Sequence, residues 1–157
     1  MDLRELENLG EPNLEISCLR VWVHGREFPD SQDFWDGNWL RVTARCTTKD
    51  TSVRAFGSLI HLREIGSLFH ECSRLYEKLE GCASLDCMEP NLTVKLTAGR
   101  CGHVDIEINI TPDHMSESHT FIDMFDQTYL PPIIAGCKAI LEEYPVRQAK
   151  ENLPSDE

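Results

Sequence analysis

The sequence predicts an α+β protein with an antiparallel β-sheet of about six to seven strands and two α-helices packed on one face. Two kinds of pattern lead to this fold class. Short segments with an apolar period of two fill most of the chain, and two longer segments have the apolar period of a helix. Turn pairs such as Lys49-Asp50 separate the segments. The predicted order is βββαββββα, and the runs of consecutive strands favour α+β over alternating α/β.

Length and composition indicate one globular domain. The chain has 157 residues, of which 41% are hydrophobic and 27% charged, and a chain of this size can bury a core without disulfide or metal staples. We expect a polar lead-in over residues 1–13, a single domain over 14–145 and a flexible acidic tail over 146–157.

The first three predicted strands occupy residues 14–23, 38–48 and about 51–60. In the first, the apolar parity switches near Cys18–Leu19, which a bulge or burial on both faces would explain. The second strand alternates cleanly, and the turn at Lys49-Asp50 should place the third strand beside it. We therefore expect three arginines on or near one solvated face: Arg41, Arg45 and Arg54.

The remaining elements follow from the same patterns. Residues 62–80 have helical spacing, and Gly81 is positioned to cap that helix. Strands are expected at 83–88, 92–98, 104–110 and about 118–125, with a hairpin at Gly99–Gly102. Lys95 should face Asp105 or Glu107 across that hairpin. The last helix should follow a cap at Asp126 or Thr128, with Pro131 and Pro132 in its first turn, and end before Pro145.

Charge and cysteine usage bear on compartment and partners. Residues 1–13 lack the basic start and apolar run of a signal peptide, and no run reaches the roughly 18 apolar residues of a membrane span. Seven scattered cysteines indicate reduced core thiols, so we expect a cytoplasmic protein. The formal charge of −12 disfavours nucleic acid and favours a basic partner, although solubility alone would also explain it.

Enzyme and metal signatures are mostly missing from the sequence. There is no GxGxxG, GxxxxGK[ST], GxSxG or HExxH motif. Three histidines and one acid could meet around a metal, but solvated loop histidines are the more common outcome: His103, Asp113, His114 and His119. Calcium could bind the oxygens of Asp30, Asp33, Asp36 and Asn38, yet their spacing suits turns better than an EF-hand. We predict no cofactor, no metal and no catalytic residue.

The stretch GREFPDSQDFWDGNWLRVTAR at 25–45 is the most distinctive part of the chain. Its aromatics could form a recognition surface, but packing of Trp35 against the sheet edge is favoured. The stretch resembles the WapI-type immunity proteins, small bacterial cytoplasmic proteins. LDCMEPNLTVKL at 85–96, GHVDIEINITPDH at 102–114 and DQTYLPPIIAGCKAILEEYPVR at 126–147 support the resemblance. The signature residues are Phe34, Trp35, Asp36, Gly37, Asn38 and Trp39.

The resemblance implies a non-enzymatic antidote that binds a cognate toxin domain, such as a nuclease, in a system such as contact-dependent inhibition. An acidic protein suits a basic nucleic-acid-binding cleft because its carboxylates can lie where phosphates would. The expected interface residues are Asp105, Glu107, Asp113, Glu117, Asp123 and Trp35. Two alternatives stay open: a stand-alone interaction or small-ligand module, and a metal-dependent hydrolase using His103, Asp113, His114 and His119.

Overall fold

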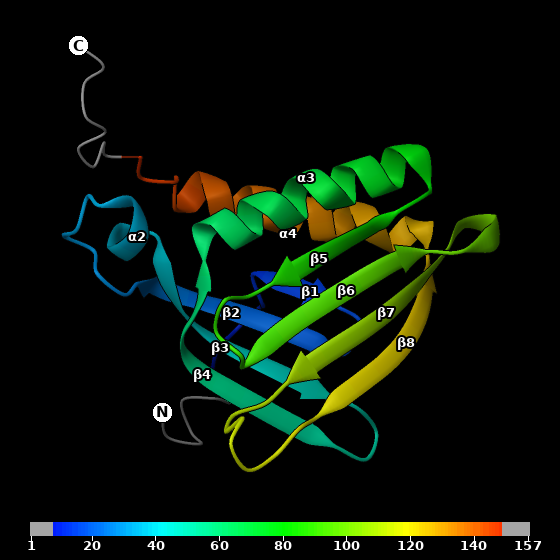
Figure 1. The fold of residues 1–157 in the computed structure, drawn as a ribbon, viewed down its shortest axis with the longest axis horizontal. Helices are drawn as coiled ribbons and strands as arrows, with labels where there is room; N and C mark the ends of the chain where they lie inside the picture. The colour runs from blue at the N-terminus through cyan, green and yellow to red at the C-terminus, as the bar shows by residue number, and fades with distance from the viewer. Residues whose placement is uncertain (1–7, 149–157) are drawn as a thin grey trace.

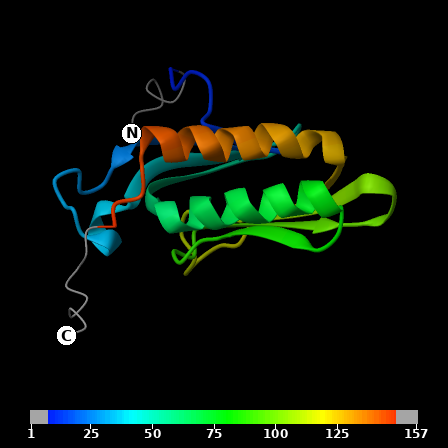
Figure 2. The same cartoon turned by 90° about the horizontal axis from the view of Figure 1, so that it is seen from above.

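The computed structural model describes residues 8–148 as an α+β fold with two four-stranded antiparallel sheets. The strands of the two sheets cross one another, and the two long helices lie side by side over them (Figures 1 and 2). The predicted fold class is confirmed, whereas the single sheet of six to seven strands is wrong. A third, short helix was also not predicted.

The first sheet has the order β1-β2-β3-β4 and contains Leu14–Ile16, Leu19–Arg26, Trp39–Thr47 and Ser52–His61. The predicted single strand over 14–23 is in fact a tight hairpin of β1 and β2. Ser17 makes the turn with a φ of 55°, and this turn explains the parity switch near Cys18. The only irregularity within β2 lies further on, between Val23 and Gly25.

The second sheet has the order β5-β6-β7-β8 and contains Cys82–Asp86, Leu92–Ala98, His103–Ile110 and Thr120–Asp126. The β6–β7 connection carries a 3₁₀ turn, η1 (Arg100–Gly102), in which Gly102 has a φ of 77°. Lys95 lies directly opposite Glu107, one of its two predicted partners. Within residues 8–148 these two side chains form no ion pair.

Helix α3 (Leu62–Lys78) follows β4 without a connecting loop, and α4 (Leu130–Glu143) closes the fold. The C-cap of α3 is Leu79 in the left-handed conformation, not the predicted Gly81. Asp126 caps η2 (Gln127–Tyr129), the 3₁₀ turn that leads into α4, and prolines occupy the first turn of α4 as predicted. The unpredicted helix α2 (Phe34–Gly37) is capped by Asp33.

The core lies where the apolar faces of both sheets and both long helices meet. Helix α3 contacts β5, helix α4 contacts β1, and the helices contact each other. Helix α3 follows β4 directly and carries the chain out of the first sheet, and β5 begins the second sheet. No helix of the described residues is long and apolar enough to cross a membrane.

Residues next to both ends of the described region are held in place. The Asn13 side chain accepts a hydrogen bond from the Val23 amide at 2.8 Å. Val146 packs against the core, and Arg147 bonds to the backbone of Pro29 and Ser31. Most of the predicted tail, 149–157, and the first seven residues of the lead-in lie outside the described residues.

Candidate functional site

The outer face of the second sheet carries three rows of side chains, each crossing all four strands. The central row runs Ser84, Lys95, Glu107, Ile122 from β5 to β8. The flanking rows consist of Cys82, Thr97, Asp105 and Met124, and of Asp86, Thr93, Asn109 and Thr120. We call these twelve residues the acidic face. It holds three carboxylates and one lysine, so its net charge is negative.

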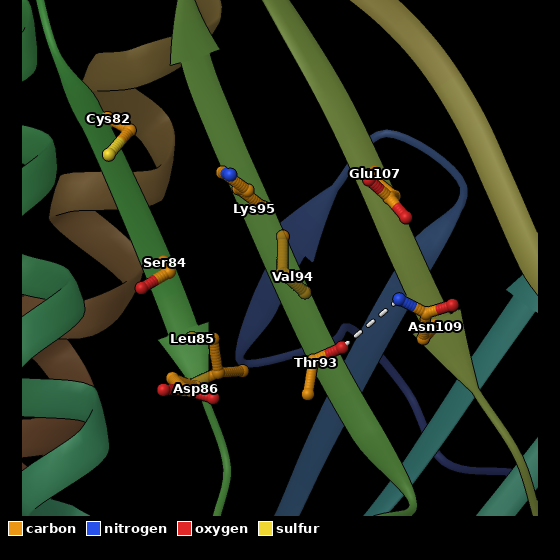
Figure 3. A pocket seen from close by; sticks show the side chains of 9 residues that line it. All are labelled: Cys82, Ser84, Leu85, Asp86, Thr93, Val94, Lys95, Glu107 and Asn109. Atoms are coloured by element: carbon orange, nitrogen blue, oxygen red, sulfur yellow. Dashed lines mark hydrogen bonds between the residues drawn. The ribbon is translucent and has the colours of Figure 1, made fainter.

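The acidic face is hollowed in two places, of which Figure 3 shows the larger. The larger hollow, about 340 Å³, lies between β5, β6 and β7 and is bordered by Asp86, Lys95 and Glu107. The smaller, about 190 Å³, lies beside Asp105 and Ile122. The two hollows and the charged side chains that border them suit contact with another macromolecule better than they suit enclosure of a small substrate.

The structure brings only two of the six predicted interface residues together on this face. Asp105 and Glu107 are exposed neighbours on β7. Asp113 and Glu117 lie in the loop between β7 and β8, at one end of the sheet. Asp123 has the opposite parity on β8, and Trp35 belongs to α2, outside the second sheet.

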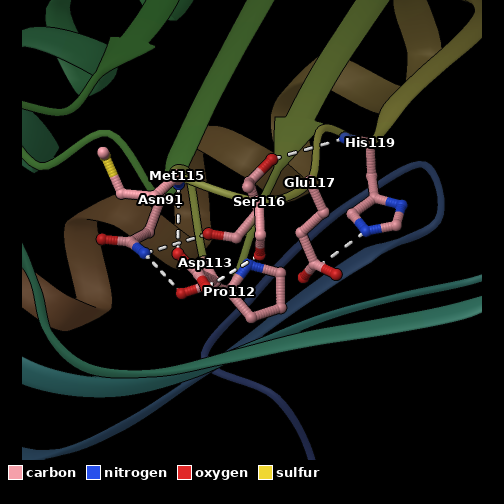
Figure 4. A network of polar contacts seen from close by, with 8 residues as sticks. Asn91, Pro112, Asp113, Met115, Ser116, Glu117 and His119 are labelled. Atoms are coloured by element: carbon pink, nitrogen blue, oxygen red, sulfur yellow. Dashed lines mark hydrogen bonds and ion pairs between the residues drawn. The ribbon is translucent and has the colours of Figure 1, made fainter.

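Asp113 organises the β7–β8 loop (Figure 4). Its carboxylate accepts hydrogen bonds from the Ser116 hydroxyl at 2.8 Å and the Met115 amide at 3.1 Å. These bonds, the hydroxyl first, lower the pKa of the Asp113 carboxyl. In the same loop Oε1 of Glu117 lies 3.6 Å from Nε2 of His119. The loop therefore has a fixed shape and presents Met115, 84% exposed, to solvent.

Asp123 points toward the first sheet, where it accepts a hydrogen bond from Ser17 in the β1–β2 turn. A groove of about 710 Å³ runs alongside. Residues of the two sheet edges, a turn of the first sheet and the start of α4 line it: Glu15, Ser17, Cys18, Thr47, Thr48, Asp123, Met124, Phe125, Asp126, Tyr129 and Pro132. The lining includes three carboxylates and no lysine or arginine.

Trp35 belongs to an aromatic cluster around His61, a residue that the sequence patterns did not single out. The His61 ring lies 5.1 to 5.5 Å from the rings of Phe34, Trp35 and Trp39. Trp35 is 46% exposed and also carries the Arg63 guanidinium over its face. The packing interpretation of Trp35 is therefore supported for one side of its ring.

Asn38 connects the same stretch to the end of the chain. It is fully buried, and its side chain bonds to Phe34, Arg26 and both backbone groups of Arg147. Asp33 caps α2, so the calcium alternative loses two of its oxygen donors to structural roles. No spacing rule could have identified Arg147, 109 residues away, as the partner of Asn38.

The four residues of the hydrolase alternative are not brought together. His103 begins β7, and Asp113, His114 and His119 lie beyond the other end of that eight-residue strand. Such a strand spans roughly 25 Å. Among residues 8–148 no group of three histidine, cysteine or acidic side chains could hold a metal ion.

The outer face of the first sheet is basic. Arg20, Arg45 and Arg54 lie directly opposite one another on β2, β3 and β4, so the prediction for Arg45 and Arg54 is supported and Arg20 is an addition. Arg45 lies over the Trp22 ring, and Arg41 lies over Phe56 and pairs with Glu27. The molecule thus presents opposite charge on its two sheets.

Most of the cysteines belong to the core, and Cys82 is the one that lies on the acidic face. All seven are free, and Cys46, Cys72, Cys87 and Cys137 are buried. Burial raises the pKa of the Cys72 and Cys137 thiols to about 12. These thiols stay protonated near neutral pH and behave as core residues.

One comparison with known proteins bears on this arrangement. A family model described as the immunity protein WapI-like family matches residues 11–145. No curated protein and no solved structure matches the chain. The matched range contains both sheets and both long helices, so it includes the acidic face and the aromatic cluster.

Proposed function

The chain belongs to the WapI-like immunity protein family, and from this premise we propose that it binds a cognate toxin domain through the acidic face and thereby neutralises it. The observation that carries the proposal is the exposed pair Asp105 and Glu107 beside the unpaired Lys95, on a hollowed sheet surface. The protein acts without catalysis, in the cytoplasm of the cell that makes it.

Charge favours a toxin domain whose substrate is a polyanion. Carboxylates on a rigid sheet can occupy the positions that phosphates take in a basic cleft. Because strands fix the spacing of Asp105 and Glu107, little ordering free energy is lost on binding. A nuclease domain is the toxin class that fits this charge pattern.

Co-expression tests the proposal. Cells that express the toxin domain encoded beside this gene should grow when the full chain is present and die when it is absent. Equal killing in both strains would contradict the proposal for that pair. An immunity role also distinguishes this chain from a stand-alone interaction module, which would leave toxicity unchanged.

The nuclease assignment has a separate readout. Unlabelled nucleic acid should compete with this chain for the purified toxin domain, because both would occupy one cleft. If the toxin binds the chain equally well at saturating nucleic acid, the acidic face covers a different surface of the toxin.

A further inference from the structure

Strand β8 has a free edge. Within residues 8–148 it pairs only with β7, and five of its seven residues are exposed. We propose that an extended, cationic segment of the partner pairs with this edge and becomes a fifth strand of the second sheet. The proposal rests on the proposed function, because it takes the toxin domain as the source of the segment.

The backbone of β8 has the orientation that strand addition needs. The Ile110 amide donates to the His119 carbonyl at 3.1 Å. In an antiparallel pair such bonded positions recur at every second residue. The backbone groups of Thr120, Ile122 and Met124 therefore point away from β7. The Met124 amide is partly satisfied by its neighbour Asp123 at 2.8 Å, which leaves Thr120 and Ile122 as open donors on this edge.

Helices cover two of the other three sheet edges. Helix α3 covers the β5 edge, where Glu71 and Glu64 accept hydrogen bonds from the amides of Ser84 and Met88. Helix α4 covers β1 so closely that a Cβ at Gly136 would lie 2.9 Å from the Asn13 carbonyl oxygen.

The β4 edge is uncovered but differs in shape and charge. It carries Arg54 and contains Gly57 with a φ of 144°, and the β3–β4 register shifts nearby. Bulges and basic side chains are the usual devices that stop an edge from pairing. Strand β8 has no proline, glycine or lysine.

Exposed apolar side chains also favour a partner at β8. Ile122 is 83% exposed and Met124 is 56% exposed, both on the acidic face at the edge. An added strand would place its own side chains beside them, and such cross-strand contacts contribute about 0.2–1 kcal/mol each.

The negative charge around the β8 edge favours a cationic segment as its partner. Asp105 and Glu107 flank the edge on the acidic face, and Asp123 and Asp126 line the groove on the other side, where Glu15 is paired with Arg20. A second copy of this chain is disfavoured. Each chain carries a net charge of −12, and pairing of two β8 edges would bring two acidic faces side by side. Because successive side chains of a strand point to opposite faces, a segment with basic side chains on both faces and an apolar one beside Ile122 fits both surroundings.

The test compares two substitutions at one position. Ile122→Pro removes the outward amide and places a ring in the path of an added strand, while the bonds to β7 stay intact. Ile122→Ser removes the apolar side chain but keeps the amide. Arg54→Pro is the matched control, because register and the Thr48–Thr51 bond place the Arg54 amide outward on the β4 edge.

Binding of each full-length variant to the toxin domain encoded beside the gene is measured by calorimetry. We expect Ile122→Pro to weaken binding about 100-fold, Ile122→Ser less than about 10-fold, and Arg54→Pro not at all. Hydrogen exchange on the wild-type complex supplies a measurement independent of any variant, with the Ile122 amide protected on binding.

Wild-type affinity for Ile122→Pro would overturn the proposal, as would equal losses for proline and serine or an unprotected Ile122 amide. A wild-type dimer that Ile122→Pro dissociates would show that the edge takes a second copy instead. If the wild-type chain does not bind the toxin domain, the proposed function fails first. If the wild-type chain and Ile122→Pro both bind and neutralise the toxin domain, the proposed function stands and only the strand-addition proposal fails.

Discussion

At the scale of single residues, two buried polar side chains fix the distinctive stretch around helix α2. Asn38 uses both its oxygen and its amide nitrogen, so loss of its side chain would leave half-buried backbone groups of Phe34 and Arg147 without these bonds. His61 donates from Nε2 toward the Phe34 and Trp35 carbonyls and accepts the Arg63 amide on Nδ1. Both residues thus join segments distant in sequence.

Asn38→Ala should lower the free energy of unfolding by about 2–4 kcal/mol, because it leaves the Phe34 carbonyl and the Arg147 backbone without partners. Urea denaturation followed by tryptophan fluorescence measures the change. Asp36→Asn, exposed in the same stretch, is the control and should shift stability by less than about 0.5 kcal/mol. Similar losses of unfolding free energy for both variants would contradict a specific role for the Asn38 hydrogen bonds.

His61 makes stability depend on pH. Burial lowers the pKa of His61 below its usual 6.5, against the opposing effect of the Trp35 and Phe34 carbonyls. The folded state therefore binds this proton less readily than the unfolded state. Stability from this group is fully present above pH 6.5 and is lost as pH falls through the folded pKa. Protonated Nδ1 also could not accept the Arg63 amide.

The free energy of unfolding should consequently fall more steeply in wild type than in His61→Asn between about pH 7.5 and pH 5. Asparagine is a good helix N-cap but does not titrate. The difference between the two proteins isolates His61, because His24, whose pKa is also lowered by burial, is present in both. Parallel pH profiles would contradict the assignment.

At the scale of elements, helix α3 connects the two sheets. Its N-cap box joins His61, the last residue of β4, to Glu64, and the second oxygen of Glu64 accepts the Met88 amide after β5 at 2.8 Å. Glu71, two turns later, accepts the Ser84 amide at 3.2 Å. The helix therefore covers the β5 edge with carboxylates as well as with apolar contacts.

Glu64→Gln should cost about 2 kcal/mol of stability, because glutamine has one acceptor oxygen for two buried amides. Glu71→Gln keeps the single bond that Glu71 makes and should cost less than about 0.5 kcal/mol. Thermal unfolding followed by circular dichroism measures both. If Glu71→Gln is the more costly variant, the bonds of Glu64 to His61 and Met88 are not the main polar link between α3 and the two sheets.

At the scale of the whole molecule, charge is separated between the two sheets. The first sheet presents aligned arginines and the second presents the acidic face. Such a distribution orients a charged partner before contact and mainly raises the association rate. The net charge of the chain alone does not reveal which of the two sheets a charged partner would approach.

Asp105→Asn combined with Glu107→Gln should slow association with the toxin domain about 10-fold at low salt. The difference should shrink at high salt, because exposed charges are screened over about 10 Å at 0.1 M. Stopped-flow measurements test both statements. Glu77→Gln combined with Glu142→Gln removes the same charge from the helices and should leave the rate nearly unchanged; equal slowing would implicate net charge rather than the acidic face.

Much of the fold could be predicted because periodicity is a local property. The period of two in residues 92–98 and 104–110 marks which side chains are buried, and the spacing after Leu62 marks the helix. The arrangement of the expected interface residues could not be read from the sequence. Asp105 and Glu107 share the outer face of β7, whereas Asp123 points toward Ser17, and alternation along β8 does not reveal which element lies on each side of the strand.

The sequence by itself determined the fold class, the apolar faces of most strands and both long helices, and the family to which the chain belongs. Only the tertiary structure decided that the strands divide into two sheets, that helices cover the β5 and β1 edges, and that β8 is left open. The physical reason is the range of the interactions. Side-chain alternation is written into neighbouring residues, whereas strand partners and bonds such as Asn38 to Arg147 form between distant segments through packing.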